Sequence, residues 1–173
     1  MSNPIYGQSD AVAVEIAAAL NANSGNFCLA VAAERRFARK LDVGDISSIG
    51  SAVTVQVFPG DELADLQGLD GIYDDTYGCH ILILQNVANA TTGGLDEAQM
   101  QLLLALRSQI VEFVASKLLS APDAVHPFSR AQVKACRNDA KEGIYDLNRL
   151  EQTNVFYSDL IVTYKMPGLR RRY

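Results

Sequence analysis

The segment from Leu95 to about Leu119 constrains the fold most strongly, because it has the pattern of one long, unusually apolar helix. Asp96 and Gln99 have the spacing of a capping box, which predicts the start of this helix. Residues 120–122 end in proline, which predicts the end of the helix. The apolar residues around this helix are Leu102, Leu103, Leu104, Leu106, Ile110, Val111, Phe113, Val114 and Leu118. They span roughly 200°, against about 100° for an ordinary surface helix. We expect one sheet face to be too narrow for this stripe, so that either the first helix or a neighbouring copy covers the rest.

Alternating residues predict strands on both sides of this helix. Segments 27–33, 53–58 and 156–165 alternate with a period of two, and 131–136 does so weakly. Segment 77–85 is apolar on both faces, which predicts a central strand. Proline is expected to end two of these strands, at 59–61 and at 166–168, because it cannot donate to a strand ladder.

Two shorter helical segments complete the predicted organisation. Residues 11–21 are alanine-rich and follow a plausible cap at Ser9-Asp10, and 146–152 has the pattern of a helical turn. We find no repeat or linker. The sequence therefore predicts a single domain over residues 1–173 of the α+β class, with a basic C-terminal tail at 166–173. We expect a mostly antiparallel sheet of about four to five strands, packed by one long and one short helix.

Composition excludes several classes of protein. The chain has 173 residues, 49% of them apolar and 20% charged, which is typical of a folded domain. Its net charge of −5 argues against a main role in binding nucleic acid. The first basic residue is Arg35, so no secretion signal is expected, and no apolar run approaches the ~18 residues of a membrane span. The three cysteines form no C-x-x-C pair, which favours reduced thiols.

Charged residues are segregated along the chain. The acidic residues predicted to share one loop are Asp61, Glu62, Asp65, Asp70, Asp74 and Asp75. The basic residues form two groups, Arg35, Arg36, Arg39 and Lys40 in the first, and Arg170, Arg171 and Arg172 in the second. Opposite charges of this kind can set the register of copies that meet head to tail. Arg107 falls inside the apolar helix stripe, where it either pairs across subunits or extends over the edge of its own chain.

The sequence contains no recognisable catalytic or metal-binding motif. It lacks G-x-S-x-G, H-E-x-x-H, a Walker loop and a dinucleotide glycine pattern, and the acidic segment lacks the spacing of an EF-hand. His80 most simply packs in a core or interface, and it faces away from Cys79 on a strand. We therefore predict no enzyme activity, no metal and no cofactor. The alternative is a small hydrolase that uses His80 with Asp74 or Asp75.

The order of these elements resembles that of the tail terminator and tail completion proteins of long-tailed bacteriophages. The resemblance lies in I-A-A-A-L-N at 16–21, N-F-C-L-A-V-A-A-E-R-R-F at 26–37 and V-T-V-Q-V-F-P at 53–59. It continues through the tyrosine-led strand 77–85, the long helix, and N-V-F-Y-S-D-L-I-V-T-Y-K at 154–165. None of these segments carries catalytic residues.

The resemblance implies a structural protein of the virion, assembled in the host cytoplasm. It implies a homo-oligomeric ring, commonly a hexamer, that caps the tail tube and joins it to the head-tail connector protein. The basic residues named above would then contact a neighbouring subunit, the tube or the connector, and the acidic loop would face a lumen through which DNA passes as cargo. Alternatives within the virion are a head-tail adaptor or stopper and a DNA-contacting connector.

Overall fold

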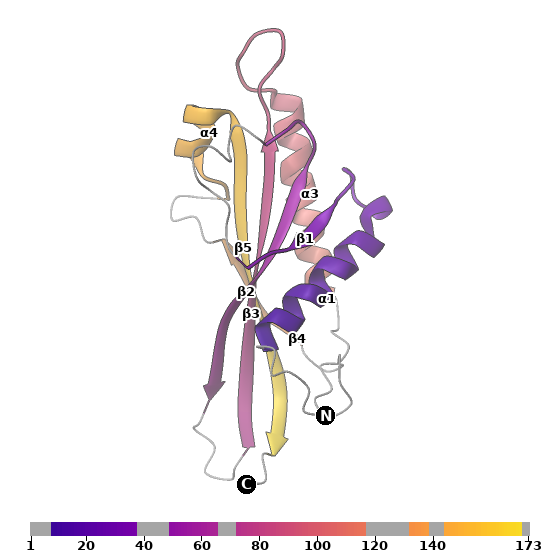
Figure 1. The fold of residues 1–173 in the computed structure, drawn as a ribbon, viewed down its shortest axis with the longest axis vertical. Helices are drawn as coiled ribbons and strands as arrows, with labels where there is room; N and C mark the ends of the chain where they lie inside the picture. The colour runs from indigo at the N-terminus through magenta and orange to yellow at the C-terminus, as the bar shows by residue number, and fades with distance from the viewer. Residues whose placement is uncertain (1–7, 38–48, 66–71, 117–131, 139–143, 171–173) are drawn as a thin grey trace.

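The computed structural model describes residues 8–37, 49–65, 72–116, 132–138 and 144–170 (Figure 1). The elements in chain order are α1 (Gln8–Ala22), a 3-10 turn (Ser24–Asn26), β1 (Ala33–Arg35), β2 (Thr54–Asp65), β3 (Ile72–Asn86), α3 (Glu97–Ser116), β4 (Gln132–Asn138), α4 (Leu147–Thr153) and β5 (Val155–Arg170). The strands form one five-stranded sheet in the order β1-β2-β3-β5-β4, in which only β1 and β2 are parallel. The predicted α+β class and mostly antiparallel sheet are confirmed.

Strand β3 lies at the centre of the sheet and carries apolar residues on both faces, as its sequence predicts. Cys79, Ile81 and Ile83 join the core beneath α1 and α3, whereas Leu82 and Leu84 point to the other face. The core on the helix face includes the most deeply buried residues of α1, namely Val12, Ala13, Ile16 and Leu20. The second, smaller cluster contains Phe58, Leu82, Leu84, Val155 and Tyr157. The helices therefore cover one face of a sheet whose opposite face has its own apolar cluster.

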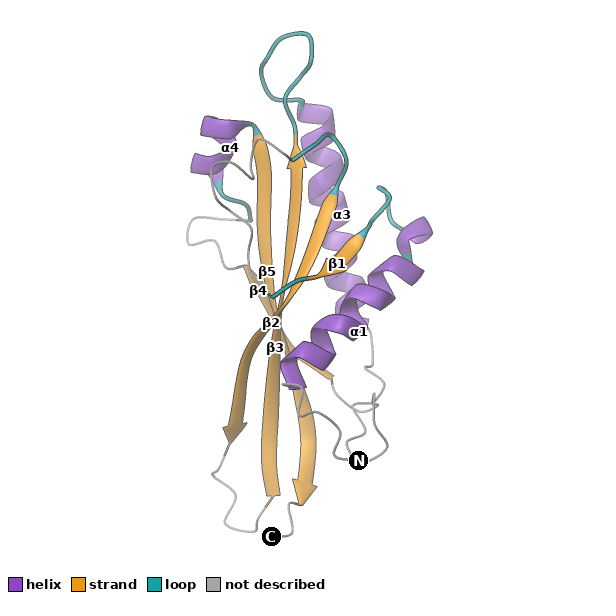
Figure 2. Ribbon diagram, in the orientation of Figure 1, coloured by secondary structure: helices purple, strands orange, loops and turns teal. Residues whose placement is uncertain are grey.

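Three strands continue far beyond the helices, which the sequence does not predict (Figures 1 and 2). We call this extension the arm and define it as residues 59–65 of β2, 72–78 of β3 and 165–170 of β5. The prediction that Pro59 ends β2 is wrong. Beyond Val57 no described strand pairs with the outer edge of β2, so a residue without an N–H is tolerated there. The pairing with β3 shifts register between Pro59 and Glu62, as at a β-bulge.

The end of the chain differs from the prediction in the same way. Residues 166–170 extend β5 along β3, with Ile72 paired to Arg170, instead of forming a separate basic tail. Pro167 falls where the register of this pair shifts, between the rows of Asp75 and Tyr73, so the strand continues past it. Residues 171–173 lie outside the described part of the chain.

The first predicted strand is much shorter than its alternating pattern suggests. Only Ala33–Arg35 pairs with β2, in parallel. The alternation still describes burial, because Val31 and Ala33 are buried while Cys28, Ala30 and Ala32 are exposed. One side of this segment packs against the core even where it makes no strand ladder.

Helix α3 begins as predicted, but one half of the capping box is absent. Asp96 accepts a hydrogen bond from the backbone N–H of Gln99 at 3.1 Å. The side chain of Gln99 does not reach back to Asp96, and instead donates to Oε1 of Gln85 on β3 at 2.9 Å. Gln85 in turn donates to the carbonyl of Ser51. The start of α3 is thereby tied to the sheet.

Candidate interaction surfaces

The apolar stripe of α3 is covered mainly by the chain itself. Its buried residues are Leu103, Leu106, Ile110 and Val114. On one flank Phe27 packs edge to face against Phe113, with ring centroids 5.7 Å apart. On the same flank the N–H of Cys28 donates to the side-chain oxygen of Gln109 at 2.8 Å. The prediction that the first helix or a neighbouring copy must cover the rest of the stripe is therefore wrong for this flank, because the segment after α1 lies along it.

The other flank of α3 faces β5, and Arg107 lies there. Its Nε donates to Oγ of Ser158 at 3.3 Å, and that hydroxyl donates to the carbonyl of Ile144 at 2.7 Å. Of the two predicted roles of Arg107, the structure contains the contact within its own chain. Leu102 is the large apolar residue of α3 that stays exposed, at 41%. The breadth of the stripe therefore does not by itself require a second subunit.

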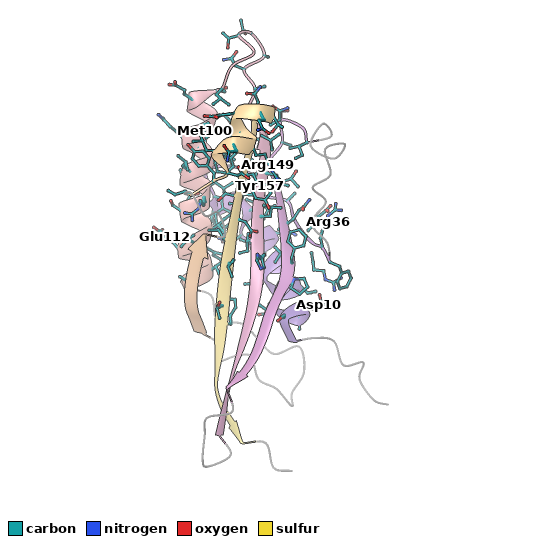
Figure 3. The ribbon with its side chains drawn as sticks, turned by 90° about the vertical axis from the view of Figure 1, so that its left-hand side faces the viewer. Asp10, Arg36, Met100, Glu112, Arg149 and Tyr157 are labelled. Atoms are coloured by element: carbon teal, nitrogen blue, oxygen red, sulfur yellow. The ribbon has the colours of Figure 1, made fainter. Side chains whose placement is uncertain are left out.

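The basic residues at the end of β1 and just after it, Arg35 and Arg36, have acidic partners within the chain. Arg35 forms an ion pair with Asp10 of α1, with Nε to Oδ1 at 2.6 Å, and both side chains are largely buried. The guanidinium of Arg35 also lies 3.3 Å from the ring centroid of Phe37. Arg36 pairs with the exposed Glu34. Figure 3 shows Arg36 and Asp10 beyond the β2 edge of the sheet, at the opposite side of the view from α3. The predicted interface residues Arg39 and Lys40 lie outside the described residues.

The acidic residues do not occupy a loop, as was predicted. Asp61, Glu62 and Asp65 belong to β2, and Asp74 and Asp75 belong to β3. Within this hairpin Asp65 pairs in register with Asp74. The sequence was misread because Pro59-Gly60 resembles a strand end, while the arm continues through it. Asp70, like Arg171 and Arg172, lies outside the described residues.

His80 has a carboxylate partner that the sequence did not indicate. Its Nδ1 lies 3.2 Å from Oδ1 of Asp159 on β5, and the two side chains are 20% and 2% exposed. Asp75, by contrast, lies five residues from His80 on the same strand, which is about 17 Å along it. The His80–Asp75 and His80–Asp74 combinations of the hydrolase alternative are therefore not brought together within one chain. Cys79 packs in the core on the opposite sheet face, as expected.

Two further contacts were missed because their partners are far apart in sequence. The side chain of Asn21 donates to the carbonyl of Ala33 at 2.8 Å and accepts from its N–H at 2.7 Å. Arg149 of α4 lies over the ring of Tyr157, 4.4 Å from its centroid (Figure 3). An asparagine at a helix end and an aromatic residue on a strand are too common to predict either contact.

The comparisons with known proteins add no family assignment. No protein-family model matches the chain, and no curated protein is similar to it in sequence. Among the described residues, no group of three or more His, Cys, Asp or Glu side chains is placed to hold a metal ion. None of the described helices is long and apolar enough to cross a membrane.

Proposed function

We propose that this protein is a structural, ring-forming subunit of a bacteriophage tail, of the terminator or completion type. The ring, a hexamer in this proposal, caps the tail tube and joins it to the head-tail connector, and DNA passes through it only as cargo. Its place is then the virion, after assembly in the host cytoplasm. The order of elements supports the assignment, because a short helix, the strands 53–59 and 77–85, a long helix and a closing strand follow one another as in that family.

The observation that carries a structural role is the arm. Three strands extend past the helices, and no described helix covers them (Figure 1). A sheet with free edges tends to pair with other strands, so natural proteins cover or protect such edges. A subunit that completes its fold against neighbouring copies has a use for this feature. In the proposed role the protein needs interfaces and no active site.

Light scattering coupled to size exclusion tests the assembly of the full chain. We expect the molar mass to rise with concentration toward a closed ring, alone or after mixing with tail tube protein. A monomer under every condition, with and without the tube protein, would contradict the proposal. Catalytic turnover lost on His80→Ala, without loss of folding, would favour the hydrolase instead.

Particles produced without this protein distinguish a terminator from an adaptor or stopper. A terminator halts growth of the tail tube, so its loss is expected to give tails of uncontrolled length that do not join heads. An adaptor or stopper acts on the head side, so its loss is expected to leave tails of normal length. Electron micrographs of the two kinds of particle separate these outcomes.

A further inference from the structure

The arm has two strand edges without a neighbouring strand among the described residues. On β2, pairing with β1 covers only Val55 to Val57, which leaves residues 58–65 as a free edge. On β5, pairing with β4 ends at Lys165, which leaves residues 166–170 as a second free edge. Apart from Pro59 and Pro167, which have no N–H, such edges present backbone N–H and C=O groups that a further strand can satisfy.

These two edges carry opposite charge in the sequence. Residues 58–65 contain three acidic residues and no Lys or Arg. Residues 166–170 contain one basic residue, Arg170, and no Asp or Glu, and in the sequence Lys165, Arg171 and Arg172 flank them. Since β3 lies between β2 and β5, the two edges of one arm are about 10 Å apart, or two strand spacings. The acidic edge is therefore available to a basic strand from outside.

The hairpin itself favours such a basic neighbour. Asp65 and Asp74 occupy directly paired positions on β2 and β3. Like charges at opposed positions of two strands destabilise the pair. A cationic strand next to β2 offsets this repulsion.

We propose that the outer edge of β2, residues 58–65, pairs with the outer edge of β5, residues 166–170, in a second copy of this chain. This inference rests on the ring-forming role proposed above and names the surfaces that join the subunits. Because the two edges are different surfaces, the contact is heterologous. Each copy uses its β2 edge toward one neighbour and its β5 edge toward the other, and the series closes into a ring when the rotation closes.

The topology sets the direction of this pairing. Strands β2 and β5 both run antiparallel to β3, so they run parallel to each other. A rotation about an axis near the strand direction preserves that direction, so each junction is a parallel pair. One row of paired residues across the arm contains Leu63, Thr76 and Lys165. Most of the free β2 edge precedes this row along its strand, whereas the free β5 edge follows it. Neighbouring copies are therefore offset along the strands, as strand tilt in a closed sheet requires.

Charge reversal tests the pairing in the full chain. One variant carries Glu62→Lys with Asp65→Lys, and the other carries Lys165→Glu with Arg170→Glu. Each reversal places like charges next to each other at every junction between copies. The apparent Kd of assembly should therefore rise at least about tenfold. A matched control, Glu112→Lys with Glu151→Lys, makes the same change in net charge as the first variant, at exposed helix positions. It should assemble like the wild type.

Mixing the two variants gives the decisive result. The first variant has one net positive charge over residues 58–65 and keeps its basic β5 edge. The second keeps its acidic β2 edge and has an acidic residue at position 170 of its β5 edge, so unlike copies attract most strongly at a junction. We expect the equimolar mixture to regain wild-type assembly in alternating rings, detected by light scattering and by native mass spectrometry. Variants that assemble like the control, or a mixture that does not regain assembly although each variant is folded by circular dichroism, would overturn the inference.

Cysteine cross-linking tests the same contact should the charge variants fail to fold. Ala64→Cys is combined in turn with Met166→Cys, Gly168→Cys or Arg170→Cys. Within one arm these positions lie on strands separated by β3, beyond the ~7 Å Cα distance that a disulfide spans. Mild oxidation should therefore give a ladder of covalent multimers on a non-reducing gel. The single variant Ala64→Cys is the control and should give no ladder.

The outcomes separate this inference from the proposed function. One outcome is that rings form although no cross-linked multimers are seen and both charge reversals are tolerated. That result would agree with the proposed function but would overturn the β2–β5 contact. Cross-links from position 64 to tail tube protein alone would also overturn it, because the edge would then belong to the tube. A wild-type chain that stays monomeric with and without tube protein would overturn the proposed function itself.

Discussion

Gly60 lies where the backbones of β2 and β3 approach each other closely. A Cβ built on Gly60 would lie 2.9 Å from the carbonyl carbon of Gly78 and 3.2 Å from the nitrogen of Cys79. These are backbone atoms of β3, so they cannot move aside as a flexible side chain does. We predict that Gly60→Ala lowers the free energy of unfolding by about 1–3 kcal/mol, measured by urea denaturation.

Gly25→Ala is the matched control for this substitution. A Cβ at Gly25 meets nothing within 4 Å, and the residue is exposed. Its effect should stay within about 0.5 kcal/mol. Equal stability of the two variants would mean that β2 and β3 do not approach each other closely at the bulge.

His80 and Asp159 connect β3 to β5 on the sheet face away from α3. Because Asp159 is almost fully buried, removing either partner leaves a polar group with a lost hydrogen bond. We predict that His80→Ala and Asp159→Ala each destabilise the fold by about 1–3 kcal/mol. In a double-mutant cycle the two effects should be non-additive by at least about 0.5 kcal/mol. Strictly additive losses would show that the pair is not coupled.

Strand β1 consists of three residues, and no described strand pairs with its outer edge, where a helix side chain binds instead. Asn21 at the end of α1 makes both hydrogen bonds to Ala33 that a further strand would make. We predict that Asn21→Ala lowers the free energy of unfolding by about 1–3 kcal/mol, because the backbone groups of the largely buried Ala33 lose their partner. Asn148→Ala, at an exposed position of α4, should change it by no more than about 0.5 kcal/mol. An Asn21 variant as stable as this control would contradict the bridging role.

The sequence predicts elements well where a local signal marks them. Asp96 and Asp146 precede α3 and α4 and cap them, each accepting from a backbone N–H three residues on. The apolar pattern of β3 on both faces also places it correctly at the centre of the sheet. These signals work because capping and burial depend on residues within a turn or a strand of one another.

The arm and the side-chain pairs could not be predicted, because neither has a local signal. Pro59 usually ends a strand, and only the absence of a described strand beside the far part of β2 makes it acceptable here. Arg35–Asp10 and His80–Asp159 join residues on different elements, whose spacing in the sequence contains no information about distance. The acidic segment was therefore read as a loop, although five of its six residues lie on two paired strands.

For the assembled molecule, the structure separates two surfaces that a ring could use. The flank of α3 is covered by Phe27 on one side and faces β5 on the other, which leaves mainly Leu102 exposed. The arm, in contrast, has two free edges among the described strands. Because burial of one partly exposed leucine contributes little compared with strand pairing, we predict that Leu102→Ser leaves the oligomeric state unchanged. The reversals at the arm edges should weaken assembly under the same conditions.

The thiol of Cys28 can show whether the flank of α3 next to Phe27 becomes buried on assembly, and this test needs no substitution. Cys28 is exposed, and its Sγ lies 3.4 Å from the carbonyl oxygen of Leu102, to which it donates. If rings form through the arm, this thiol stays accessible, and a maleimide should label it at the same rate in assembled rings and in dispersed subunits. Peptide mapping separates it from Cys79, which is buried in the core, and from Cys136, the third cysteine of the chain. Protection of Cys28 on assembly would place α3 in the interface, because only a neighbouring copy could then cover a position that its own fold leaves open.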